Sequence, residues 1–192
     1  MNKTRLEAFS DGVLAIIITI MVLEFKLPEN GTCEALTPLL PKFLSYVLSF
    51  IYVGIYWNNH HHMMHTVKQV NGKILWANLH LLFWLSLIPF ATAWIGENHF
   101  SEFPMMLYGI ILFMNGFAYF ILQIQIIKIH GKDSVLSKAI GNGLKEKASV
   151  ILYAVAIALA NFYPAISGGI YIFVALMWLV PDKRIERIFN EK

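Results

Sequence analysis

Six apolar segments, separated by short polar connections, make up most of this 192-residue sequence. A window of about 19 residues, the length of a membrane-spanning helix, separates them clearly. The fifth and sixth segments are short and are joined only by residues 163–164, which predicts a tight helical hairpin. The segments are Ala8–Phe25, Leu39–Met63, Ile74–Ile95, Pro104–Ile127, Ala148–Phe162 and Ala165–Val180.

The charged residues between these segments alternate in number along the chain. Thirteen of the 15 Lys and Arg residues fall in every other connection, counting from the N-terminus. Because positively charged connections stay on the cytoplasmic side of a membrane, this pattern predicts that both termini are cytoplasmic. An even number of spans requires the same arrangement, so the two observations agree.

Composition supports an all-α integral membrane protein that forms a single domain over residues 1–192. Hydrophobic residues make up 57% of the chain and the mean hydropathy is +0.59, whereas ordinary soluble domains are about 45–50% apolar. The net charge of +3 comes from cations in the connections, so no nucleic-acid partner is expected. An intramembrane di-iron enzyme would need several separated His clusters, and the sequence has one cluster plus His80, so no enzymatic activity is expected. Cys33 is the single cysteine.

The first apolar segment carries a stripe that admits two interpretations. On a helix Ile16, Ile20 and Leu23 follow one another at i, i+4 and i+7, with Thr19 on the same side. The stripe can pack on lipid or on neighbouring helices, and a Thr hydroxyl can bond to the carbonyl four residues earlier. The same residues can instead line a pore. Val22 is expected on the lipid-facing side.

Asp11 lies about one turn inside this segment, where a short acidic side chain needs a partner. Together with Arg5 and Ser10 it can form a hydrogen-bonded cluster that fixes the helix against its neighbours. Direct contact of Asp11 with an ion is the alternative. Donor side chains for such a cluster occur at the end of the second segment and in the third. The candidates are Trp57, His60, His61, Trp76 and His80; the same stretches also offer Asn58, Asn59, His62, His65, Asn78 and Trp84 as donors.

The motif Arg5-x-x-x-Phe9-Ser10-Asp11 at the head of the first segment resembles the R-x-x-x-F-S-D signature of the transmembrane protein 175 family. That family comprises endosomal and lysosomal potassium channels and their prokaryotic relatives. Six spans and a His-rich second span are also similar to the family. A chain with one six-span repeat resembles the bacterial and archaeal members, which assemble as tetramers. The resemblance therefore implies a homotetramer in the cell membrane, with six transmembrane helices per chain around a central pore that the first helix lines.

The resemblance also assigns roles to residues of the first helix. The hydrophobic constriction of the family corresponds to Ile16, Ile20 and Leu23, and its hydroxyl layer to Thr19. The signature residues Arg5, Phe9, Ser10 and Asp11 would form the structural cluster with the His and Trp partners named above. The chain has no TVGYG loop, so a carbonyl filter is not expected. The implied function is a potassium-permeable cation channel with weak to moderate preference for K⁺ over Na⁺. Its implied partners are membrane lipid and monovalent cations, with no cofactor other than the permeant K⁺.

The stretch HHHMMH at residues 60–65 supports an alternative function. His61 and His65 lie at i and i+4 and could share a transition metal, with methionine as a soft ligand. The protein would then be a metal transporter or sensor, although no acid or cysteine stands nearby to complete a site. A secondary transporter is a further alternative, since Pro89 could break a helix at mid-membrane. Passive ion flux without a coupled gradient would distinguish a channel from both.

Overall fold

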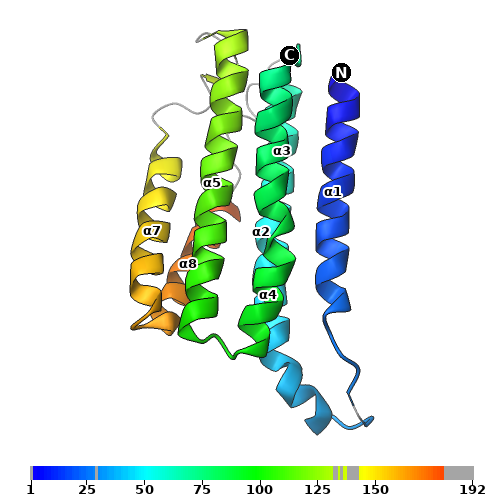
Figure 1. The fold of residues 1–192 in the computed structure, drawn as a ribbon, viewed down its shortest axis with the longest axis vertical. Helices are drawn as coiled ribbons and strands as arrows, with labels where there is room; N and C mark the ends of the chain where they lie inside the picture. The colour runs from blue at the N-terminus through cyan, green and yellow to red at the C-terminus, as the bar shows by residue number, and fades with distance from the viewer. Residues whose placement is uncertain (1, 29, 132–133, 135, 138–142, 180–192) are drawn as a thin grey trace.

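The computed structural model describes residues 2–28, 30–131, 134, 136–137 and 143–179, and this part of the chain is helical with no strand (Figure 1). The all-α membrane architecture expected from the hydrophobic pattern is confirmed. Four helical stretches are long and apolar enough to cross a membrane: Lys3–Leu23, Glu34–His65, Gly72–Glu97 and Glu102–His130. The elements are α1 (Lys3–Leu23), η1 (Glu34–Leu39), α2 (Leu40–His65), α3 (Gly72–Ser86), α4 (Ile88–Glu97), α5 (Glu102–His130), α7 (Leu144–Ala160) and α8 (Pro164–Leu179).

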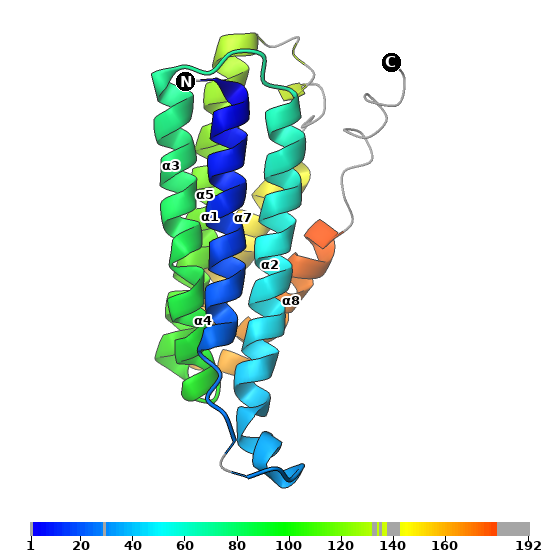
Figure 2. The same cartoon turned by 90° about the vertical axis from the view of Figure 1, so that its right-hand side faces the viewer.

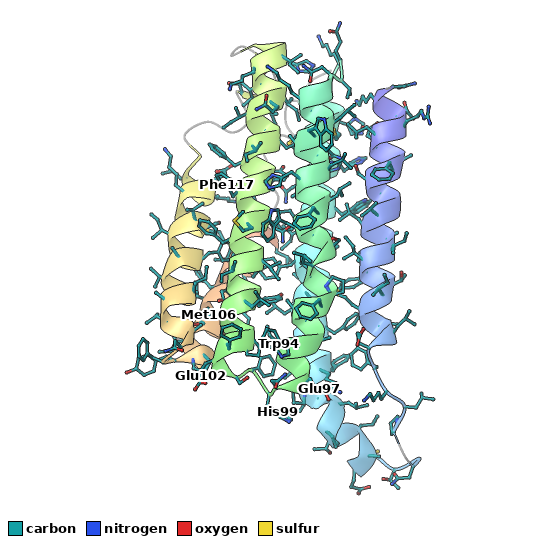
Figure 3. The ribbon with its side chains drawn as sticks, in the orientation of Figure 1. Trp94, Glu97, His99, Glu102, Met106 and Phe117 are labelled. Carbon is teal, nitrogen blue, oxygen red and sulfur yellow. The ribbon has the colours of Figure 1, made fainter. Side chains whose placement is uncertain are left out.

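The helices stand roughly antiparallel in an elongated bundle, with α1 at one edge and α7 and α8 at the other (Figure 1). The start of α1, the end of α2 and the start of α3 meet at one end, while η1 and its connection lie at the opposite end (Figure 2). There Lys42 forms an ion pair with Glu97, which joins the start of α2 to the end of α4 (Figure 3). We call the end that holds the N-terminus the basic end, because the sequence concentrates Lys and Arg in its connections.

Most predicted boundaries shift by a few residues, and two differences have a clear local cause. The first helix begins at Lys3 rather than Ala8 because the side chain of Asn2 accepts a hydrogen bond from the Thr4 N–H (3.0 Å), a typical helix N-cap. The predicted third segment consists of two helices, α3 and α4, that meet at Leu87. Val180, the last residue of the predicted sixth segment, lies outside the described residues.

The α3–α4 junction has a local chemical cause. Pro89 stands in the first turn of α4 and has no backbone N–H to donate to the preceding turn. At the end of α3 the Leu87 N–H bonds back to the Trp84 carbonyl (3.2 Å), and a neighbouring helix gives that carbonyl a second donor. The Asn115 amide of α5 donates to the Trp84 carbonyl (3.4 Å) and to the Ile111 carbonyl (2.9 Å). In the described part of the chain its Oδ1 atom has no hydrogen-bond partner.

Glycine allows helices to approach closely at two positions. A Cβ atom on Gly96 would lie 2.7 Å from the Cα of Lys42, so α4 contacts the α2 backbone directly there. A Cβ atom on Gly109 of α5 would overlap the hydroxyl of Tyr171 from α8. That hydroxyl is buried and donates to the Met105 carbonyl (3.1 Å). The α5–α8 contact therefore depends on the absence of a side chain at residue 109.

We expect Gly109→Ala to lower the stability of the bundle by about 1–3 kcal/mol, because the added methyl group displaces Tyr171 from a filled interior. The measurement is the temperature at which the detergent-solubilised protein loses its monodisperse size-exclusion peak. Gly169→Ala on α8 is the matched control, since a Cβ atom there meets nothing within 4 Å. Equal transition temperatures for the two variants would contradict the prediction.

Candidate functional site

Helix α1 packs against the rest of the chain along one side only. Its buried residues recur every three or four positions, which places them on a single face that contacts α2, α3 and α4. The remaining face is not covered by any described residue of the chain. The buried residues are Leu6, Ser10, Leu14, Ile17 and Met21.

The apolar stripe predicted for α1 lies on the uncovered face. Ile16 is 57% exposed, Ile20 40% and Leu23 77%. The Thr19 hydroxyl is also on this face and donates back to the carbonyls of Ala15 (3.0 Å) and Ile16 (2.9 Å). Its oxygen lone pairs remain available to a group outside the helix.

The uncovered face is broad enough to present two different surfaces. Its centre is formed by the small residues Ala8, Gly12 and Ala15, all exposed. Val22 is 49% exposed, and six residues further along a helix of 3.6 residues per turn it points about 120° away from Ile16. The two side chains therefore cannot face the same partner.

Behind the stripe, three buried polar side chains join α1, α3 and α2. The Ser10 hydroxyl donates to the Leu6 carbonyl (2.9 Å) and accepts a hydrogen bond from the Asn78 amide (2.9 Å). The Oδ1 atom of Asn78 then accepts from Nε2 of His60 (2.7 Å), which assigns the proton of a neutral His60 to Nε2. Ser10 and Asn78 are fully buried and His60 is nearly so. We call these three residues the polar cluster.

Asp11 faces a different way from Ser10 and is exposed. It accepts a hydrogen bond from Nε1 of Trp57 on α2 (3.1 Å). The ring of His61 stacks on Trp57, with centroids 6.1 Å apart. Asp11 therefore belongs to a second set of contacts, separate from the polar cluster, that runs through Trp57 and His61 of α2.

The other residues that the sequence suggested for this region lie elsewhere. Trp76 is 75% exposed on α3. His80 accepts a hydrogen bond from Nε1 of Trp84 on its own helix (3.0 Å). The side chains of Arg5 and Phe9 are exposed on α1.

Asn78, the central residue of the polar cluster, was among the donors that the sequence offers in the third segment but was not chosen as a partner of Ser10 or Asp11. The spacing of Asn78 along the sequence would have identified it as a buried residue. It falls in register with the buried residues Ile74, Leu81 and Leu85 on one face of α3. An amide within an otherwise apolar buried face requires a polar partner from another helix, whereas Trp76 does not share that face.

The HHHMMH stretch does not form a metal site within the described residues, where no three His, Cys, Asp or Glu side chains come together. His60 is directed to Asn78, and Met63 and Met64 are buried in the apolar core. The rings of His61 and His65 meet edge to face, with centroids 4.7 Å apart.

Comparisons with known proteins point to one family. The family model described as endosomal/lysosomal potassium channel TMEM175 matches residues 5–89. A potassium channel of Chryseobacterium sp. is 61% identical over 191 residues and is covered in full, as is this chain. A potassium channel of Streptomyces collinus is 39% identical over 102 residues, half of each chain. The crystal structure of a lysosomal potassium-selective channel TMEM175 homologue from Chamaesiphon minutus superimposes with a TM-score of 0.80, at 27% identity, over 94% of this chain and 97% of that one.

We expect Asn78→Leu to destabilise the protein strongly, since Ser10 and His60 would each lose a partner in a buried setting at about 1–3 kcal/mol per group. The measurement is the yield and thermal stability of the purified protein. Asn161→Leu, at an exposed position after α7, is the control for changing an asparagine to leucine. If Asn78→Leu is as stable as Asn161→Leu, the polar cluster does not hold α1 in place.

Proposed function

This chain belongs to the TMEM175 family, and we propose that it is a potassium-permeable cation channel in which four copies enclose a central pore. Each copy contributes α1 to the pore. The channel resides in the cell membrane as a multi-pass protein with both termini in the cytoplasm. The names of the relatives support potassium as the permeant ion.

The observation that carries this proposal is the single-sided packing of α1. A membrane helix at the edge of a bundle can face lipid with its whole free surface, but a threonine at the centre of that surface then gains nothing from lipid. In a ring of four chains the same surface surrounds an axis. Ile16, Ile20 and Leu23 then supply successive apolar constrictions, and Thr19 supplies a layer of hydroxyl oxygens between them.

An apolar constriction can both gate and select. A narrow ring of isoleucine side chains excludes water, so an ion must lose part of its hydration shell to pass. K⁺ holds its water more weakly than Na⁺, and the constriction therefore impedes Na⁺ more. The oxygens of Thr19 replace some of the lost hydration. The constriction and the Thr19 layer are the selective elements of this arrangement. Because neither coordinates the ion fully, the expected preference for K⁺ over Na⁺ is weak to moderate.

The polar cluster has a supporting role in this proposal. It fixes the rotation of α1 about its own axis, because Ser10 must point at Asn78. A rotation of α1 would carry Ile16 off the axis and would break the buried hydrogen bond from Asn78 to Ser10. Asp11 has Trp57 as its partner and therefore belongs to the supporting structure rather than to the ion pathway.

We expect Ile16→Asn to raise total cation flux by about tenfold and to lower the preference for K⁺ over Na⁺, since four polar groups on the axis would wet the constriction. Thr19→Ala should lower the preference without raising the flux, because the apolar rings remain. The measurement is flux from liposomes loaded with K⁺, Na⁺ or Cs⁺.

Val22→Asn is the matched control, since it places the same amide on α1 at a position directed away from Ile16. Its flux should equal that of the parent. A leaky Val22→Asn together with a parent-like Ile16→Asn would mean that the other flank of α1 faces the axis. A parent that passes none of the three cations, or passes them only with a coupled gradient, would overturn the channel proposal itself.

We also expect the purified protein to have the mass of four chains. Helix α1 presents one uncovered face that carries apolar side chains and a threonine, and several copies are needed for such a face to surround an axis. Light scattering coupled to size-exclusion chromatography in mild detergent measures the mass, and brief crosslinking should give a four-step ladder. A monomer or dimer under the conditions that preserve flux would contradict this stoichiometry.

A further inference from the structure

An apolar cavity of about 580 Å³ lies on the side of the bundle away from α1, among α2, α5, α7 and α8. Its volume falls in the range of about 300–1,000 Å³ that is typical of ligand sites. The channel proposal does not use this cavity. Its walls are mostly aliphatic and aromatic, with Ile55, Phe113, Phe117, Phe120, Val150 and Ile151 among the lining residues.

The cavity has the length of one membrane leaflet. Along α5 it extends from Phe113 to Gln123, and ten residues of helix span about 15 Å. That is half of the hydrocarbon thickness of a typical bilayer, about 30 Å. Phe113 is near the middle of α5, and Gln123 is closer to the basic end. The cavity therefore occupies the half of the bundle that belongs to the leaflet at the basic end.

The mouth of the cavity opens sideways. Phe117, Phe120 and Ile151 line it and are also 46%, 49% and 63% exposed on the outer surface of the bundle. Phe117 lies on the part of α5 that faces α7 (Figure 3). In a membrane this opening meets acyl chains rather than water, and water gains little in a cavity with apolar walls.

The end of the cavity nearest the basic end is polar, with one lysine and one glutamate in its lining and a second lysine beside it. Lys147 and Glu146 of α7 line it, together with the side chain of Gln123, which is 5% exposed. Next to them the ammonium group of Lys145 lies 5.9 Å from the ring centroid of Trp178. The first turn of α7 follows Gly143 and has no side-chain cap, so its N–H groups add partial positive charge.

We propose that this cavity binds one acyl chain of an anionic phospholipid from the leaflet at the basic end. The chain lies along Phe117 and Phe120, and the phosphate is held by Lys147 and the first turn of α7. An apolar slot one leaflet long, open to lipid and topped by cations, matches a lipid with a negative headgroup in both shape and charge. This assignment does not depend on ion conduction, and it is tested without measuring flux.

The experiment is native mass spectrometry of the purified protein in mild detergent, with phosphatidylglycerol or phosphatidylcholine added at equal concentration. We expect one retained phosphatidylglycerol per chain, in preference to phosphatidylcholine by about fivefold, the effect of roughly one lysine near a phosphate. Lys147→Gln should remove the preference between the two lipids. Lys128→Gln, an exposed lysine at the end of α5 outside the cavity, should leave the preference intact.

Filling the cavity should abolish retention of both lipids. Gly116 lines the cavity, and its nearest neighbour for a Cβ atom is the Tyr56 hydroxyl at 3.9 Å, so Gly116→Leu projects into free space. Gly169→Leu adds the same side chain to α8 at an exposed position. Retention by Gly116→Leu equal to that of Gly169→Leu would overturn the proposal.

A measurement on the parent protein covers the case in which a variant does not fold. Phosphatidylglycerol with a photoreactive diazirine in its acyl chain, added in vesicles of phosphatidylcholine, should label peptides that contain Phe117, Phe120 or Ile151. Labelling confined to other helices, or no preference for phosphatidylglycerol in the parent, would show that the cavity holds something other than this lipid.

Discussion

The hydrogen bonds from the Asn78 amide to Ser10 and from His60 to the Asn78 carbonyl oxygen are the interaction on which the arrangement of α1 depends. Apolar contacts alone give a membrane helix little reason to prefer one orientation, because lipid tails are as apolar as leucine. A buried amide that needs both its donor and its acceptor satisfied is directional. It aligns α1, α2 and α3 with one another, and it determines which residues of α1 remain outside the contact.

The single-sided packing of α1 separates two tasks along one helix. Leu6, Leu14, Ile17 and Met21 hold it to its own chain, while Ile16, Thr19, Ile20 and Leu23 stay available for other contacts. These sets occupy different faces of the helix, so a rotation of about 100°, equal to one residue of register, would turn Ile16 and Ile20 toward the other helices of the chain. The proposed pore face is therefore determined by the same hydrogen bonds that stabilise the individual chain.

The sequence predicted the class of the protein and the helices better than it predicted the pairs of residues in contact. Long apolar runs identify spans because hydrocarbon excludes unsatisfied backbone. Such runs are apolar all round, however, and so they do not indicate which side of a helix faces which neighbour. Ser10, Trp57 and His60 were predicted to be near one another, and each is found bonded across two helices. Asn78 was offered as a donor but not chosen, and the junction at Leu87 was not predicted, because an apolar run does not show which groups a neighbouring helix reaches.

The distance along the sequence between Ser10 and Asn78 has a consequence for how the protein is made. The two residues are 68 positions apart. At a synthesis rate of about 5–20 residues per second, α1 waits for roughly 3–14 s before the residue that pairs with Ser10 has been made. During that time the Ser10 hydroxyl has a partner in its own helix, the Leu6 carbonyl. The internal bond allows α1 to enter the bilayer alone, and the bond to α3 then orients it once the third helix arrives.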